Sequence, residues 1–235
     1  MRFTKDMIAY AIVVKDNQVS ESGFARLCQS SKEVGNKFEI KRFDAVTPDK
    51  AMFELNKAML KWTWPWIGSE QCLKSGLVKS AYQTADPNKR IACFMSHYKL
   101  WQQVKEPILI LEHDAEFMMP LDMAILDTKY DIIGINDPLR ATRKAREYKS
   151  IIVSADTTDP VLSIPVIDSW QVPQGLAGNS AYIMKANGSK NVIDKVKELG
   201  AWPNDALMCY QNIPFMGVST QFYTRVQGLP SLTTQ

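Results

Sequence analysis

The segment Glu112-His113-Asp114 has the residue types with the clearest chemical use in this chain. It directly follows Ile108–Leu111, a short apolar run that predicts a buried β-strand, and Glu116 comes soon after it. Asp and Glu are almost never fully buried without partners, so this group does not fit a plain core. Carboxylate oxygens are ligands that Mg²⁺ and Mn²⁺ prefer. The segment therefore predicts a divalent-cation site, with a solvated strand end and an Asp helix cap as the alternative.

The elements around this segment predict an α/β fold. The chain opens with a predicted strand at Ile8–Val14, a helix at Glu21–Val34 and a strand at Phe38–Phe43. This β-α-β order favours a parallel sheet with a right-handed crossover. Ligands of such sheets bind outside the carboxyl ends of the strands, where Glu112-His113-Asp114 would lie.

The remaining pattern continues the alternation of helices and strands. Further helices are predicted at Thr47–Lys61, Ile91–Val104 and Ala186–Leu199, and further strands at Asp131–Asn136, Val161–Val166, Ser180–Met184 and Phe215–Thr220. Asp137–Lys149 is predicted as a polar, basic connector, and Asn204 or Asp205 as the cap of a late helix. The cluster Trp62–Trp66 is read as hydrophobic packing, with an exposed stacking surface as the alternative.

Composition is that of an ordinary globular protein and does not indicate a disordered chain, a zinc-binding module or a membrane-spanning protein. Hydrophobic residues make up 46% and charged residues 23%, and the net charge is +3, which is ordinary for a globular protein. The four cysteines form no CxxC pair or zinc-ligand spacing, so we expect reduced thiols and a cytoplasmic location. We expect neither a signal peptide nor a transmembrane segment, because no apolar run approaches about 20 residues. A peripheral membrane contact stays open.

An ordered set of motifs resembles glycosyltransferase family 25, which includes bacterial lipooligosaccharide galactosyltransferases and collagen galactosyltransferases. The family's Ser-His helix, hydrophobic strand and Glu-Asp-Asp are similar to Ser96-His97, Ile108–Leu111 and Glu112-His113-Asp114. Its late Gly-x-x-x-Tyr strand and Pro-x-Asp resemble Gly178–Tyr182 and Pro203-Asn204-Asp205. Further similar features, near the start of the chain, are Ile8–Val14, Arg26 and Phe43-Asp44-Ala45-Val46.

Two departures from the family pattern affect the site. His113 replaces the middle Asp of Glu-Asp-Asp, which changes the site charge by one unit. Lys89-Arg90-Ile91-Ala92 stands where the family has Gly-Glu-Ile-Gly, so a cation replaces an acid; Arg90 faces either a diphosphate or solvent.

The resemblance implies a GT-A-type fold with a Rossmann-like, mostly parallel central sheet flanked by helices. It implies a single domain over residues 1–235, with a nucleotide-sugar-binding half at 1–136 and an acceptor and catalytic half at 137–235. It also implies an inverting transfer from a nucleotide-sugar, of the UDP-hexose kind, to a glycan hydroxyl in lipooligosaccharide biosynthesis. The implied cofactor is Mn²⁺ or Mg²⁺, held through a DxD-like motif.

The resemblance also assigns roles to single residues. Asp205 is the candidate catalytic base, with a helix-capping Asp as the alternative. Asp114 is the first candidate metal ligand, with Glu112 and His113 as its partners. His97 shares a helix face with large apolar side chains, which favours a hydrogen-bonded core histidine. The expected donor-binding residues are Val14, Lys15, Asn17, Asp44, Arg90, Glu112, His113, Gly178 and Asn179, although turn chemistry also explains Asn17.

Three other functions remain open at this point. Arg140–Lys149 and Trp62–Trp66 would serve a glycosyltransferase that acts on nucleic-acid bases; the basic stretch is otherwise a mobile loop or a cover over the diphosphate. His113 leaves room for a non-catalytic GT-A-like binding module. A metal-dependent nucleotidyltransferase, which also uses carboxylates at strand ends, ranks lowest.

Overall fold

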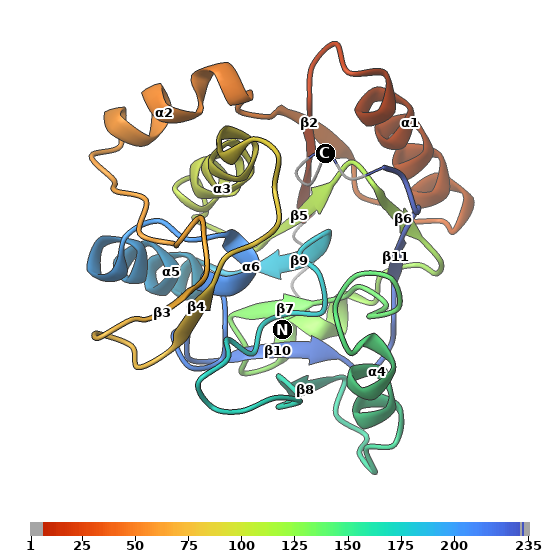
Figure 1. The fold of residues 1–235 in the computed structure, drawn as a ribbon. Helices are drawn as coiled ribbons and strands as arrows, with labels where there is room; N and C mark the ends of the chain where they lie inside the picture. The colour runs from red at the N-terminus through yellow and green to blue at the C-terminus, as the bar shows by residue number, and fades with distance from the viewer. Residues whose placement is uncertain (1–6, 231, 233–235) are drawn as a thin grey trace.

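A seven-stranded sheet with helices on both faces forms the centre of the computed structural model, which describes residues 7–230 and residue 232 (Figure 1). The strand order is β2 (Ile40–Asp44), β1 (Ile8–Val13), β5 (Ile108–Glu112), β9 (Ala181–Met184), β7 (Ile132–Gly134), β10 (Met216–Ser219) and β8 (Val161–Ser163). Five of these seven strands run in one direction, and β9 and β8 run against them. The expected α/β class, with a mostly parallel central sheet flanked by helices, is therefore confirmed.

The opening β-α-β unit is also confirmed. Strand β1 pairs in parallel with both β2 and β5, and α1 (Gln18–Glu33) connects β1 to β2. In this register Ile12 lies opposite Glu112, so the end of β5 is held beside the end of β1. The carboxyl ends of the two strands thus meet at one edge of the sheet.

Each face of the sheet has its own apolar core. Ile108 and Ile110 pack with buried residues of α2 (Pro48–Lys57), α3 (Pro87–Trp101) and α5 (Ala186–Leu199). Leu109 and Leu111 point the other way and pack in a second cluster that contains Leu27 of α1. Figure 1 shows α2, α3 and α5 on one side and α1 on the other. The alternation follows from the two-residue period of a strand, and the all-apolar run of β5 is buried on both faces.

The antiparallel direction of β9 places its first residues at the site. Leu111 pairs with Ala181, and the backbone N–H of Glu112 donates to the carbonyl of Ser180 at 2.8 Å. Because β9 runs against β5, the loop before β9 lies next to the carboxyl end of β5.

Two local predictions were wrong. The segment Asp137–Lys149 is not wholly a connector, since α4 (Ala145–Val153) begins within it and buries Tyr148 and Ile152. Helix α6 (Asn204–Leu207) has Pro203 at its N-cap position and no side-chain cap, so neither Asn204 nor Asp205 caps it as expected.

The smaller elements are β3 (Ser69–Gln71), β4 (Val78–Ser80), β6 (Ala115–Phe117), η1 (Met123–Asp127) and β11 (Thr224–Val226). The tryptophan cluster packs inward: Trp64 is buried against Trp202 and donates to the carbonyl of Ser80, while Trp62 stacks on the half-exposed Trp66. Among the described residues, the structure contains no helix long and apolar enough to cross a membrane.

Candidate active site

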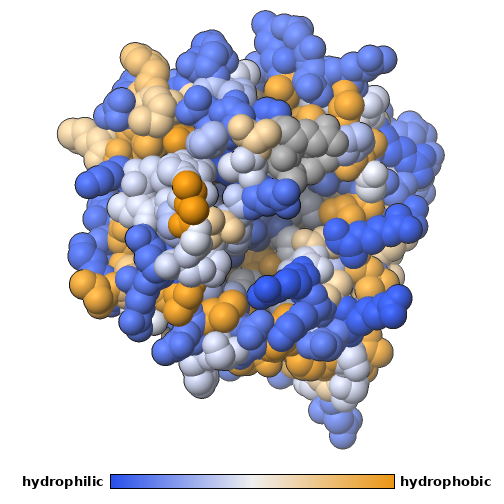
Figure 2. Space-filling model, viewed as in Figure 1, coloured by the Kyte–Doolittle hydropathy of each residue, from blue (hydrophilic) through white to orange (hydrophobic). Residues whose placement is uncertain are grey.

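A cavity of about 700 Å³ opens at the carboxyl ends of β1 and β5 and the start of β9. Its other walls come from α3, from α6, from residues 140–142, and from Val226 and residues 228–230. Figure 2 shows a hollow near the centre of this face of the molecule, with strongly hydrophilic side chains along its rim. This volume suits an organic ligand of nucleotide-sugar size.

The structure brings most of the predicted site residues to this cavity. Its wall includes Val14, Asn17, Arg90, Glu112, His113, Asp114, Gly178, Asn179 and Asp205. Lys15 and Asp44 do not line it. Lys15 is exposed in the turn after β1, and the Asp44 carboxylate pairs with Arg42 at 2.6 Å.

A chain of hydrogen bonds orients Glu112. The Trp101 indole N–H donates to Tyr182 Oη at 2.8 Å, Tyr182 Oη lies 2.8 Å from His97 Nδ1, and His97 Nε2 lies 3.0 Å from Glu112 Oε1. Because the Tyr182 hydroxyl accepts from Trp101, its own proton can be donated to Nδ1, and the N–H on Nε2 of His97 donates to Glu112. Burial raises the pKa of Glu112, but the hydrogen bond and charge of His97 outweigh it, and the pKa lies below its usual range.

Ser96 and His97 are adjacent in α3 but have different roles, since Ser96 holds a loop to the helix and His97 binds Glu112. Ser96 Oγ accepts from the backbone N–H of Val46 at 2.9 Å and donates to the carbonyl of Ala92. It fastens the segment after β2 to the helix. His97, which is buried and hydrogen-bonded as its helix face predicted, positions a carboxylate of the site.

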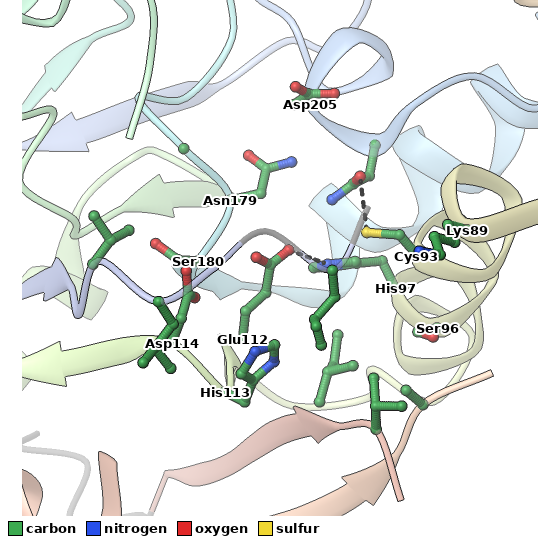
Figure 3. Close-up of a pocket in the computed structure, with 18 of the residues that line it drawn as sticks. Lys89, Cys93, Ser96, His97, Glu112, His113, Asp114, Asn179, Ser180 and Asp205 are labelled. Atoms are coloured by element: carbon green, nitrogen blue, oxygen red, sulfur yellow. Dashed lines mark hydrogen bonds and ion pairs between the residues drawn. The ribbon is translucent and has the colours of Figure 1, made fainter. Parts of the chain in front are cut away.

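Buried polar atoms without a partner gather on one part of the wall (Figure 3). Within the described part of the chain, Asp114 Oδ1, both amide atoms of Asn179 and Ser180 Oγ are buried and lack a hydrogen bond. Such atoms cost stability unless a ligand satisfies them. Burial, together with the neighbouring charge of Glu112, raises the pKa of Asp114 to about 7.

His113 stands between the two carboxylates in the chain and faces α1. Burial lowers the pKa of its imidazole against the opposing charge of Glu112, which favours the neutral ring that binds metals. A Cβ added to Gly23 would lie 2.8 Å from the carbonyl oxygen of His113, so the missing side chain of Gly23 makes room for this loop.

Asp205 lies across the cavity from the acidic segment, with Asn179 between them in the view of Figure 3. Its side chain is open to the cavity, whose poorly solvated walls raise the pKa of the carboxyl, while the charge of Arg90 opposes that shift. Arg90 stacks on the ring of Tyr82 at 5.2 Å. Burial raises the pKa of the Tyr82 hydroxyl well above its usual value, and the charge of Asp205 and a hydrogen bond to it add to the rise.

Comparison with known proteins identifies the family. The family model described as glycosyltransferase family 25 (LPS biosynthesis protein) matches residues 21–208, which is most of the chain. The chain belongs to glycosyltransferase family 25. It is therefore a glycosyltransferase by family, as its motifs predicted.

Other comparisons are more distant. A crystal structure of an active-site mutant of LgtC aligns over 90% of this chain and 72% of that one, with 12% identity and a TM-score of 0.43. The galactosyltransferase LgtC in complex with donor and acceptor sugar analogues aligns over 90% and 73%, with 10% identity and a TM-score of 0.42. No curated protein matches the sequence.

The glycines of this family 25 chain bring protein segments together. Gly178 has φ +80°, and a Cβ there would lie 2.7 Å from the Cβ of Ala141. A Cβ on Gly175 would lie 2.7 Å from the carbonyl oxygen of Asp205. Gly178, an expected donor-binding residue, lines the cavity, and the close approach that these two glycines allow within the protein is to the 140–142 segment and to α6.

Several residues of the wall were missed by sequence reasoning. Cys93 lies one helical turn before His97, so helix periodicity offered a signal for it. Ser180 follows Asn179 directly, and Asn204 is the middle residue of the Pro-x-Asp motif, so both motifs pointed to their neighbourhood. In each case the residue type alone gave no reason to select it.

Part of the basic stretch Arg140–Lys149 is paired within the protein. Arg143 and Lys144 both pair with Asp168, and Lys149 pairs with Asp137 at 2.6 Å. Arg140 lines the cavity. A continuous positive track of the kind that follows a nucleic-acid backbone is not formed by these paired side chains, whereas Arg140 is placed to meet an anionic ligand.

Proposed function

We propose that this family 25 glycosyltransferase uses a divalent cation and transfers a hexose, with inversion, from a UDP-sugar to a hydroxyl of a lipopolysaccharide-type glycan. The observation that carries the proposal is the group of buried, unpartnered polar atoms on Asp114, Asn179 and Ser180, opposite Asp205 across one cavity. Within this proposal, residues 1–136 bind most of the nucleotide-sugar, and residues 137–235 supply Asp205 and the acceptor side.

The donor atoms fit a hard divalent ion. Glu112 and Asp114 offer carboxylate oxygens, Asn179 and Ser180 offer an amide and a hydroxyl oxygen, and His113 offers a neutral imidazole. Mg²⁺ and Mn²⁺ favour such ligands and leave positions for phosphate oxygens. When bound, the ion would supply charge stabilisation for the departing diphosphate.

Asp205 is the proposed base. In an inverting transfer the acceptor oxygen attacks the anomeric carbon as the bond from that carbon to the diphosphate oxygen breaks, and the hydroxyl proton passes to Asp205. The raised pKa of this carboxyl makes it a better proton acceptor than an ordinary Asp. Arg90 and Arg140 add positive charge to the wall that an anionic donor would face.

The nucleoside part of the donor is assigned to the end of β1. Val14 and Asn17 line the cavity there, whereas Lys15 and Asp44 lie outside its wall. We therefore propose Val14 and Asn17 as donor contacts ahead of the other two.

The first test is a thermal-shift and hydrolysis panel of UDP-, GDP- and CMP-sugars, with and without Mn²⁺. We expect a UDP-hexose to stabilise the wild type only with the cation, and Asp114→Asn to lose that response. Asp205→Asn should keep donor binding but transfer to a glycan acceptor about 10²–10⁴-fold more slowly. NMR of the anomeric proton of the product reports inversion or retention.

Asp44→Asn is the matched control, because it removes a carboxylate outside the cavity. Its donor response should equal that of the wild type. Donor binding with no turnover on any glycan would support a non-catalytic binding module, and no response to donor or cation would refute the proposed site.

A further inference from the structure

We propose that Cys93, His97 and Glu112 form a second cation site, selective for thiophilic ions such as Zn²⁺, next to the hard-ion site assigned to Asp114. The three side chains offer one thiol sulfur, one imidazole nitrogen and one carboxylate oxygen, and these atoms all lie within 4.8 Å of one another. They come from adjacent turns of α3 and from the end of β5, so the backbone holds them in place.

The ligand types determine which ion fits. A thiolate with an imidazole and a carboxylate is a donor set for Zn²⁺, while Mg²⁺ and Mn²⁺ prefer oxygen ligands throughout. Asn204 Oδ1 lies 3.7 Å from Cys93 Sγ, so an amide oxygen stands beside the sulfur as a fourth donor. A four-coordinate ion can therefore be completed by Asn204 or by water from the cavity.

The surroundings of His97 already match those of a metal-ligating histidine. Its Nδ1 is held by Tyr182 Oη at 2.8 Å, and Tyr182 is in turn held by the indole N–H of Trp101. Ligating histidines usually have their second nitrogen fixed in this way. The ion would replace the proton between His97 Nε2 and Glu112 Oε1, which are 3.0 Å apart, and Nδ1 would then carry the ring proton.

Charge and protons balance on binding. Cys93 loses its thiol proton to solvent and His97 keeps one proton, now on Nδ1. Glu112 would then be withdrawn from the hard-ion site that it shares with Asp114 in the proposed function, so Zn²⁺ should inhibit the transferase. Ion binding is independent of the proposed function, and only the inhibition rests on it.

Direct binding of Co²⁺, as a spectroscopic substitute for Zn²⁺, tests the site on the full chain. Thiolate-to-cobalt charge transfer absorbs in the near ultraviolet, and we expect this band in the wild type at one ion per chain, with displacement by Zn²⁺. Cys93→Ser should abolish the band, and His97→Gln should weaken Co²⁺ binding by about tenfold or more. Cys72→Ser, which removes a thiol outside the cavity, should leave the band unchanged.

Thermal unfolding of each variant verifies that it is folded. A band that survives in a folded Cys93→Ser chain, or that disappears in Cys72→Ser, would overturn the site whatever the activity of the enzyme. Should the band be present, the Zn²⁺ concentration that halves transfer should rise at least about tenfold in Cys93→Ser. A band without inhibition by Zn²⁺ would overturn the proposed withdrawal of Glu112 alone.

Discussion

The carboxylates of Glu112 and Asp114 have opposite electrostatic surroundings although they are two positions apart in the sequence. His97 donates to Glu112 and lowers its pKa despite burial. Asp114 Oδ1 has no hydrogen-bond partner among the described residues, and burial raises the pKa of this carboxyl to about 7 although its own backbone N–H opposes the rise. One carboxylate is thus held ionised by the protein, and the other depends on a ligand. This difference fits the proposed cation site, in which the protein holds Glu112 in place and Asp114 ionises as the cation binds.

Cation binding should accordingly depend on pH through Asp114. Below about pH 7 its carboxyl is protonated and must lose a proton to bind, so the apparent Mn²⁺ affinity should rise by up to about tenfold per pH unit and level off above pH 7. The lowered pKa of His113 favours the neutral ring over the same range. Calorimetric Mn²⁺ titrations from about pH 5.5 to about pH 8.5 measure this. A flat profile in the wild type would contradict the prediction, and Asp114→Asn should remove the slope.

At the scale of elements, the start of α1 has two roles. Its N-cap residue, Asn17, satisfies a backbone N–H of the first turn and also lines the cavity. Asn17 Oδ1 accepts from the backbone N–H of Ser20 at 3.0 Å, and Ser20 Oγ accepts from the N–H of Val14 at 2.8 Å. Asn17 is therefore an N-cap whose side-chain oxygen is already engaged. Its proposed contact with the donor has to come from its remaining amide N–H groups.

Two variants of Asn17 separate capping from donor binding. Asn17→Ala should lower the free energy of unfolding by about 1 kcal/mol, because the cap is lost. Asn17→Asp should keep that stability, since Asp caps equally well, but weaken the binding of an anionic UDP-sugar. Urea unfolding and donor titration provide the two readouts. If Asn17→Asp unfolded as readily as Asn17→Ala, the capping role would be wrong.

At the scale of the whole molecule, the cavity is assembled from segments far apart in the chain. Gln227 joins three of them: its side-chain amide donates to the carbonyls of Gly23, His113 and Ala115 at 2.9, 3.2 and 2.9 Å. Its backbone N–H donates to the carbonyl of Asp114 at 2.7 Å. These bonds form a clamp that fixes the segment after β11 to α1 and to residues 113–115, the acidic loop.

Removal of this clamp should loosen the acidic loop. Gln227→Ala leaves three carbonyls without their donor and should cost about 1–3 kcal/mol of stability, with faster amide hydrogen exchange around Asp114. Gln29→Ala, which removes an exposed glutamine amide with one bond to Glu33, should stay within about 0.5 kcal/mol. Equal stability of the two variants would show that the clamp does not hold the loop.

Local pattern in the sequence determined the elements and indicated the chemistry that we propose for the acidic segment. Side-chain periodicity predicts the strand at Ile108–Leu111, the opening β-α-β unit and the helix Ala186–Leu199. This periodicity is a local property, because it depends only on residues that are close together in the sequence. Two carboxylates after a buried strand likewise indicated a cation site from residue type alone. The motifs around these elements resembled the family to which the chain belongs.

Only the tertiary structure decided which residues meet. Pairing direction does not follow from periodicity, and the antiparallel direction of β9 is what carries Asn179 and Ser180 to the end of β5. Contacts between distant segments, such as Gln227 with the acidic loop or Gly175 with α6, depend on packing that no local window of sequence contains. For the same reason Lys15 and Asp44 follow strands at the correct edge yet lie outside the cavity wall, while Cys93, which no motif selected, lies beside Glu112.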